Sequence, residues 1–500
     1  MIRYISTQQS LFEGFKHPFD QELDEKNRWV ILANAIPWDT FASYYYSVMS
    51  RDHGAPCKDA RIVLGALIIK HEQNLSDRDT LKMIQENIYL QYFVGLPSFS
   101  KHPVFSAALF VDIRKRVGKD ILERMIQAMI ISDESFVKKG QLKVTNVTEL
   151  DYEEETNHGD LKIDASVADA DIRFPLDLNL LNKTREESER MIDSLWSKSG
   201  KGSIKPRTYR RKARKDYLAF AMNKKGRNNK NGCKKQLRYL RRNITTVSIL
   251  FQEFNSESPF MKRLVDKYFF IKEIYEQQFK IAEGKKVKDR IVSFHMPFVR
   301  PIVRGKLARK TEFGAKINVS ISNGFAQIDQ LKWNAYNEGV YLKEQVEAYY
   351  TLHGYYPARI YADKIYLNRE NRGYLKDLNI QIIGKPLGRK AQSKEGKERS
   401  KILQKEMGKR NEVEGFFETC KRKYGLNNIK ARRQDTSESW IASICLVYNL
   451  MKLQRKLIQK FSCAYLKLNC ILVILRDFLS ENIDYHQWSR NRGAEPILFF

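Results

Sequence analysis

The chain has 500 residues, of which 42% are hydrophobic and 29% charged. It is therefore too long for one compact core, and we expect at least two domains. Lysine and arginine number 88 against 59 aspartates and glutamates, a formal charge of +29, which favours a polyanionic partner such as nucleic acid.

An anionic membrane is the alternative polyanion, but it would require an anchor. The most apolar late stretch, residues 463–479, is interrupted by Lys467 and too short to span a bilayer. Residues 1–15 lack the continuous apolar segment of a signal peptide.

Six cysteines without a C-x2-C pair suit a reducing cytosol and argue against a zinc site or disulfide framework. The absence of a GxxxxGK[ST] motif argues against an ATP-driven step.

The first 120 residues are predicted to be mostly helical. An apolar stripe of helical period covers 58–72, a capping box at Ser76 introduces a second helix over 79–96, and a third is expected over 103–118. Consecutive helices with a tight turn are compatible with a helix-turn-helix, and equally with any small helical bundle.

The stretch 149–160, ELDYEEETNHGD, is acidic and has no core-facing pattern, which predicts a linker. It divides the chain into a helical domain over 1–150, which we expect to be a DNA-binding domain if its consecutive helices form a helix-turn-helix, and a second domain over 151–500. In the second domain strand patterns alternate with helices, which predicts an α/β core with a mixed sheet. The expected strands are 161–167, 312–322 and 325–333, joined by the turn signal Asn323-Gly324, then 358–363 and 379–384.

A long insertion, residues 184–300, separates the first two of these strands. Within it, residues 198–242 hold eighteen lysines and arginines and one acid, Asp216, with tyrosines and a phenylalanine between the charges. A solvated helical surface is the simple interpretation, but so little balances the charge that we predict a basic, largely helical arm that follows phosphates. A second basic run, 388–410, is expected to be a partly mobile loop.

Residues 410–421, RNEVEGFFETCK, carry a possible catalytic pattern. At about 100° per residue, Arg410, Glu414 and Lys421 fall on one narrow face of a helix, which places a carboxylate between two cations. Asp164 in LKIDASV and Asp363 in ARIYAD belong to short strand patterns. Three carboxylates with flanking cations are what phosphodiester chemistry with two divalent ions requires.

Each of these carboxylates has a competing interpretation. Asp363 could cap the following helix, and Glu414 could be a surface residue paired with Arg410. Asp164 differs, because a carboxylate inside a strand is costly to bury without a cation. Residues that compete for the same roles are Asp169 and Asp171, beyond the first strand, and Glu418 and Glu412, of which Glu412 is expected to point elsewhere.

The chain resembles bacterial insertion-sequence transposases of the DDE type over residues 55–120 and 160–455. The resemblance is carried by the segments 161–182, 361–376 and 410–432, and by the spacing Arg-x3-Glu-x6-Lys in the last. It implies an RNase H-like core and a DNA transposase. It also places the acidic triad, as catalytic residues and metal ligands, at Asp164, Asp363 and Glu414.

The resemblance further implies two Mg²⁺ ions, with Mn²⁺ able to substitute. One ion activates water and the other stabilises the leaving 3′ oxygen, and the freed 3′-OH then attacks target DNA. Arg410, Lys421 and Lys364 would bind DNA phosphate. The implied partners are element ends and target DNA, with assembly into a homodimer or higher oligomer on DNA, no membrane, and a cytoplasmic, nucleoid-associated location.

One position departs from the family pattern. Where the family has a tyrosine three residues before the arginine, this chain has Met407, so a contact from that hydroxyl is missing. This departure leaves an inactive DNA-binding relative as one alternative. A metal-dependent nuclease with the same core but without strand transfer is the other, because only a joining assay separates it from a transposase. No covalent protein–DNA intermediate is required, which disfavours a recombinase with a tyrosine nucleophile.

Overall fold

The computed structural model describes most of the chain in two compact units. The described residues are 22–50, 53, 56–141 (side chains to 132), 157–198, 204–222, 230–252, 258–303, 311–384 and 405–459. Of these, residues up to Ala66, Arg78–Val104 and residues from Val447 form the first unit, and Leu67–Asp77 with Phe105–Leu446 form the second. The division 1–150 and 151–500 stays a proposal about function. The segments 1–15 and 463–479, and most of 388–410, for which the sequence made predictions, lie outside the described residues.

The first unit is helical. Asn27 and Asn87 cap helices through their side-chain oxygens, and Trp29 and Trp38 pack edge-on against Phe93 at ring-centroid distances of 5.0 and 5.5 Å. Arg61 lies in this core, where it donates hydrogen bonds to the backbone carbonyls of residues 92 and 93. The helices are α1 (Arg28–Ala35), α2 (Trp38–Tyr46), the start of α3 (Ala60–Glu72), α4 (Asp77–Glu86) and α5 (Ile88–Phe93).

Two of the predicted N-terminal helices need correction. The single helix predicted over 79–96 is two helices, because the Asn87 side chain accepts the backbone N–H groups of Tyr89 and Leu90 and so starts α5. The helix predicted over 103–118 is shorter, α6 (Leu109–Arg116), and α7 (Lys119–Gln141) follows it. The apolar pattern continues on both sides of Asn87, so periodicity alone does not show that one helix ends and another begins there.

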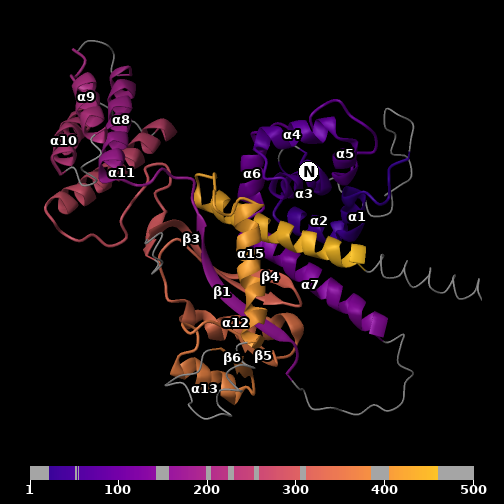
Figure 1. The fold of residues 1–500 in the computed structure, drawn as a ribbon. Coiled ribbons are helices and arrows are strands. Elements are labelled where there is room, and N and C mark those ends of the chain that lie inside the picture. The colour runs from indigo at the N-terminus through magenta and orange to yellow at the C-terminus, as the bar shows by residue number, and fades with distance from the viewer. Residues whose placement is uncertain are drawn as a thin grey trace, which may run out of the picture. The chain divides into compact units, whose positions relative to one another are not determined.

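The second unit contains a six-stranded mixed sheet (Figure 1). Its order is β2-β3-β1-β5-β6, with β4 also paired to β3; β1 is antiparallel to β3 and parallel to β5, and β5 is parallel to β6. The mixed α/β prediction is confirmed. The strands are β1 (Asp160–Asp169), β2 (Arg300–Val303), β3 (Thr311–Ser322), β4 (Phe325–Lys332), β5 (Arg359–Tyr361) and β6 (Gln381–Ile383).

The turn signal between the second and third predicted strands is confirmed. Asn323 and Gly324 have φ of +51° and +84°, the two left-handed positions of a tight hairpin turn that asparagine and glycine tolerate best. β3 and β4 leave this turn as an antiparallel pair with one register shift at Asn318. The short β2 was not predicted.

Helices cover both faces of the sheet. On one face α12 (Leu342–His353) and α13 (Arg369–Asp377) bury Leu161 and Ile163 of β1 in a core shared with β5. On the other face lies α15 (Asn411–Arg422), preceded by the 3-10 helix η2 (Gly408–Arg410). The two faces therefore take alternate residues of β1.

The insertion is helical, as predicted. It comprises α8 (Asp177–Trp196), α9 (Arg210–Ala221), α10 (Lys230–Gln252) and α11 (Pro259–Ala282), which share an apolar core. Inside the bundle Arg185 of α8 is 1% exposed and donates to Gln236 at 3.0 Å, Asn182 at 2.7 Å and Glu189. Because a buried guanidinium is costly unless satisfied, this network fixes how α8 and α10 pack.

Asp329 of β4 gives the second unit a pH-dependent stability. Its carboxylate accepts hydrogen bonds from Ser320 at 2.8 Å and Gln345 at 2.6 Å. Burial, with a smaller contribution from Glu123, raises the pKa of Asp329 to about 7. The folded pKa exceeds the unfolded one, so the folded state retains a proton that the unfolded state loses, and stability falls as pH rises between about 4 and 7.

We expect Asp329→Asn to raise the free energy of unfolding at pH 8 and to remove this pH dependence. A shift of about three pKa units limits the gain to roughly 4 kcal/mol. Because the side chain keeps some solvent contact, we expect about 1–3 kcal/mol. Urea unfolding from pH 4 to 8 measures it. The control is Asp193→Asn: hydrogen bonds from Arg210 and Lys205 lower that pKa, so this variant should instead lose stability at neutral pH.

Candidate functional site

Asp164 and Glu414 meet at one guanidinium. Arg410, at the junction of η2 and α15, donates from Nη1 to Asp164 Oδ2 at 3.0 Å and from Nη2 to Glu414 Oε1. Asp164 comes from the middle of β1, and α15 lies across that strand (Figure 1). The competing interpretation of Glu414 as the ion-pair partner of Arg410 is confirmed, and the same arginine also reaches Asp164.

Two further contacts hold α15 against the same face of β1. Lys162 Nζ lies 2.6 Å from Glu412 Oε2, and Lys421 Nζ donates to Ser166 Oγ at 3.0 Å. Residues 162, 164 and 166 alternate along the strand, so all three point toward α15. The expectation that Glu412 points elsewhere is wrong, since it fixes the helix to the strand; Glu418 instead pairs with Arg422 on the exposed side.

Asp164 lies in a strongly electrostatic environment. Burial raises its pKa, and so do the charges of Glu338 and Glu414, while the N–H of Ala165 and the guanidinium of Arg410 lower it. Because burial and two neighbouring carboxylates disfavour the ionised form of Asp164, a nearby cation is needed to stabilise its negative charge. In this structure the guanidinium of Arg410, 3.0 Å from Asp164 Oδ2, is that cation.

Asp363 follows β5, the parallel neighbour of β1. The paired residues include Leu161 with Ile360 and Lys162 with Tyr361. Continuing that register by two residues sets Asp363 level with Asp164, and neighbouring strands lie about 4.8 Å apart. Within the part of the chain described here, however, no three His, Cys, Asp or Glu side chains are close enough to hold one metal ion, so Asp363 is not gathered with the other two carboxylates.

Asp363 is not the cap of the next helix. Asn368 has that role, because its side chain accepts the N–H of Asn371 at the start of α13. Asp363 instead begins a turn in which its carbonyl accepts the N–H of Tyr366, and its carboxylate accepts the N–H of Lys364 at 2.7 Å. Asp363 and Lys364 are both exposed, so a ligand can reach them.

Other predicted positions are placed as follows. Asp169 is an odd number of residues from Asp164 along β1, so its side chain lies on the face of the strand away from α15. Asp171 lies beyond the strand, where its backbone N–H donates to the carbonyl of Ile429. These two do not replace Asp164. Met407, the position of the family tyrosine, directly precedes η2 and is partly buried.

Sequence reasoning missed two groups near Asp164. Glu338, held by Lys316 at 2.7 Å, adds to the effect of burial in raising the pKa of Asp164. Burial, and to a smaller extent the charges of Glu338 and Asp164, raise the pKa of Tyr366. The Tyr366 hydroxyl is buried and has no hydrogen-bond partner among the described residues. No local pattern marks these residues, whereas the alternation of Lys162, Asp164 and Ser166 could have been read from LKIDASV.

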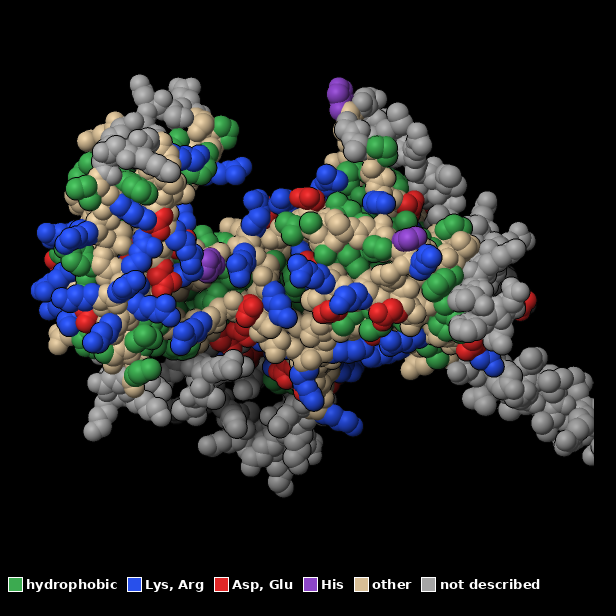
Figure 2. Space-filling model, turned by 90° about the horizontal axis from the view of Figure 1, so that it is seen from above, with side chains coloured by type: hydrophobic (Ala, Val, Ile, Leu, Met, Phe, Trp, Pro, Cys, Tyr) green, Lys and Arg blue, Asp and Glu red, His purple; other side chains and the backbone are tan. Residues whose placement is uncertain are grey.

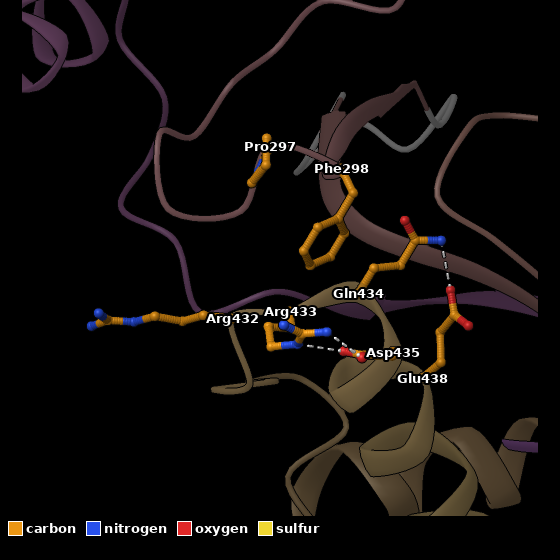
Figure 3. A pocket seen from close by; sticks show the side chains of 7 residues that line it. All are labelled: Pro297, Phe298, Arg432, Arg433, Gln434, Asp435 and Glu438. Atoms are coloured by element: carbon orange, nitrogen blue, oxygen red, sulfur yellow. Dashed lines mark hydrogen bonds and ion pairs between the residues drawn. The ribbon is translucent and has the colours of Figure 1, made fainter. Parts of the chain in front are cut away.

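An open pocket of about 520 Å³ lies elsewhere in the second unit. In Figure 3, Arg433 pairs with Asp435 and Gln434 with Glu438, while Arg432 projects away from them. Pro297 and Phe298 complete its lining. In the part of the chain that the structure describes, its lining residues form no hydrogen bond or ion pair with Asp164, Asp363 or Glu414, so we treat the pocket as separate from the carboxylates.

The helical insertion presents a strongly basic surface, and lysines and arginines gather over it in Figure 2. On α10, Lys230, Lys234, Arg238 and Arg241 follow one another at spacings of four, four and three, so they form one exposed stripe. Among the described residues none of the four has an acidic partner. We call these four residues the α10 stripe.

The aromatic residues between these charges serve the bundle more than its surface. Tyr217 donates to Asn179 and Tyr239 to Asp216, and Phe220 packs against Gly232. Tyr209 is 45% exposed. The interleaved aromatics are therefore mainly structural.

No helix in the described ranges is both long and apolar enough to cross a bilayer.

Comparisons with known proteins match two parts of the chain. A family model described as a transposase domain (DUF772) matches residues 17–116, and one described as a transposase DDE domain matches residues 360–451. An uncharacterized Rhizobium meliloti protein, ORF8 in the nfe locus, is 29% identical over 120 residues, which is 23% of this chain. The match spans little more than half of that relative, 56% of its length. No solved structure was found to match.

Proposed function

We propose that this chain, which is related to insertion-sequence transposases of the DDE type, is a DNA transposase that cleaves element ends and joins them to target DNA. The two transposase-domain matches confirm the relationship. The observation that carries the proposal is the meeting of Asp164 and Glu414 at Arg410, with Asp363 at the end of the adjacent parallel strand. A mixed sheet with Asp164 on β1, Asp363 just after the parallel strand β5 and Glu414 on the covering helix α15 supports an RNase H-like core.

The carboxylates and the cations of the site have different roles. Asp164, Asp363 and Glu414 offer only oxygen donors, which fit Mg²⁺ or Mn²⁺ better than zinc. Such ions, when bound, supply an activated water and stabilise the leaving 3′ oxygen. Arg410, Lys421 and Lys364 orient the phosphate and balance its charge.

The test is a joining assay on the full chain. A labelled duplex carrying the element's end is incubated with Mg²⁺ and a target duplex, and the products are separated by size. We expect strand cleavage that leaves a 3′-OH, followed by a larger joined product. Cleavage without joining would identify the nuclease alternative, and binding without cleavage the inactive relative. Either result would reject the transposase.

We place the reaction in the cytoplasm, on the nucleoid. We expect a homodimer or higher oligomer, because an element has two ends.

Recognition of the element's ends is assigned to α4. Thr80, Leu81 and Ile84 are buried, whereas Arg78 and Lys82 are exposed one turn apart. A helix with such a face can present side chains to base edges in the major groove.

We expect Arg78→Ala and Lys82→Ala each to reduce the preference for the element's end over random duplex. A lost base contact costs about 1–3 kcal/mol of discrimination, or roughly 5- to 150-fold. Competition binding with both duplexes measures the preference. An equal loss of affinity for both duplexes would mean that these side chains contact phosphate and that α4 does not read sequence.

A further inference from the structure

Arg410 occupies the position between two carboxylates that come from different elements. Its guanidinium spans Asp164 of β1 and Glu414 of α15, with side-chain exposures of 19% for the arginine, 20% for the aspartate and 51% for the glutamate. Glu414 also contributes to the raised pKa of Asp164, so the two carboxylates repel one another. The guanidinium therefore offsets a repulsion that a divalent ion would offset in the same place.

The geometry restricts what can bind at once. Nη1 and Nη2 each take one carboxylate oxygen, and the Asp164 contact uses Oδ2 while the N–H of Ala165 takes Oδ1. A metal ion held between the two side chains would compete with the guanidinium for Asp164 Oδ2 and Glu414 Oε1. A planar guanidinium is also the side chain best suited to a phosphate, which it can bind through two parallel hydrogen bonds.

We propose that Arg410 is an internal competitor of the metal, so that metal binds tightly only when a DNA phosphate draws the guanidinium away. This rests on the proposed function and adds its regulation. The carboxylates would then acquire their full affinity for metal only in the presence of substrate. Binding of metal and DNA must be coupled reciprocally, each tightening the other by the same factor.

The first experiment measures Mn²⁺ binding to the full chain without DNA. We expect Arg410→Gln to bind Mn²⁺ about tenfold more tightly than the original chain, as seen by calorimetry or by loss of the free-ion electron paramagnetic resonance signal. Arg422→Gln is the matched control, because Arg422 forms the same i,i+4 ion pair on α15, with Glu418 at 2.8 Å. Within the described ranges it makes no hydrogen bond or ion pair with Asp164 or Glu414. It should leave Mn²⁺ affinity unchanged. Equal affinity of Arg410→Gln and the original chain would overturn the inference.

Loss of any nearby positive charge could also tighten metal binding. Lys421→Gln removes one positive charge beside Ser166, two residues along β1 from Asp164, and leaves the guanidinium of Arg410 in place between the two carboxylates. It should tighten Mn²⁺ binding by less than threefold. An effect as large as that of Arg410→Gln would show that general electrostatics, not displacement, is the cause, and the inference would fail.

The second experiment repeats the titration with a 20-base-pair random duplex. DNA should tighten Mn²⁺ binding to the original chain and should have little further effect on Arg410→Gln; equal tightening of both would reject the inference. Failure of the proposed function would look different. If the double variant Asp164→Asn, Glu414→Gln bound Mn²⁺ as well as the original chain, these carboxylates would not be the metal site at all.

Discussion

Replacing Asp164 or Asp363 with alanine is expected to abolish both strand cleavage and strand transfer while DNA binding persists. The carboxylates act on the transition state through the metal, and losing several kcal/mol of such stabilisation lowers the rate about a thousandfold or more. Affinity for DNA comes mainly from cations elsewhere in the chain, so a duplex should bind each variant nearly as well as before. The joining assay and a filter-binding assay on the same preparations measure the two quantities.

The third carboxylate allows a closely matched comparison. Glu414→Gln should lose cleavage, whereas Glu418→Gln, four residues along α15 and exposed beside Arg422, should retain it. Thermal unfolding of each variant excludes loss of fold as the cause. Near-normal cleavage by Asp363→Ala would remove that residue from the ligand set. Glu338 would then be the next candidate ligand, because its negative charge also raises the pKa of Asp164.

The elements that sequence could predict are those with a local physical signal. The alternation in LKIDASV gave β1, and the pair Asn323-Gly324 gave the β3–β4 turn, because few residues tolerate two successive left-handed conformations. β2 was missed because its four residues are too few for a period to be visible, whereas β5 and β6, with three residues each, lie inside the longer predicted runs 358–363 and 379–384. A helix break at Asn87 depends on one side-chain cap inside an uninterrupted apolar pattern, which periodicity does not detect.

The site was predictable only as far as local pattern and family resemblance reach. One helix face gave Arg410, Glu414 and Lys421 together. The guanidinium bridge to Asp164 depends on α15 crossing β1, a contact between residues 246 positions apart that no local rule specifies. Likewise, Glu338 comes close to Asp164 through the η1 (Glu338–Tyr341) and β3 packing, and its own segment gives no sign of it.

The α10 stripe should supply much of the sequence-independent affinity for DNA. From Lys230 to Arg241 it extends about 17 Å along the helix, since the rise is 1.5 Å per residue, and this allows it to face several phosphates. Replacing Lys234, Arg238 and Arg241 with glutamine should lower the slope of log affinity against log salt by about 2.7, because each lost phosphate contact accounts for roughly 0.9. At 0.1 M salt this corresponds to about two to three orders of magnitude in affinity.

The matched control removes the same charge from another part of the same unit. The exposed Arg369 and Lys376 of α13, and Lys343 of α12, which is half-buried and pairs with Glu370 at 2.7 Å, lie on the face of the sheet opposite α15. Their replacement with glutamine should leave the slope nearly unchanged. Fluorescence anisotropy of a random duplex at five or more salt concentrations gives the slope directly. If both triple variants lowered it equally, net charge alone would set the affinity. If neither did, the stripe would face a protein partner or solvent, and the arm would not follow the DNA backbone.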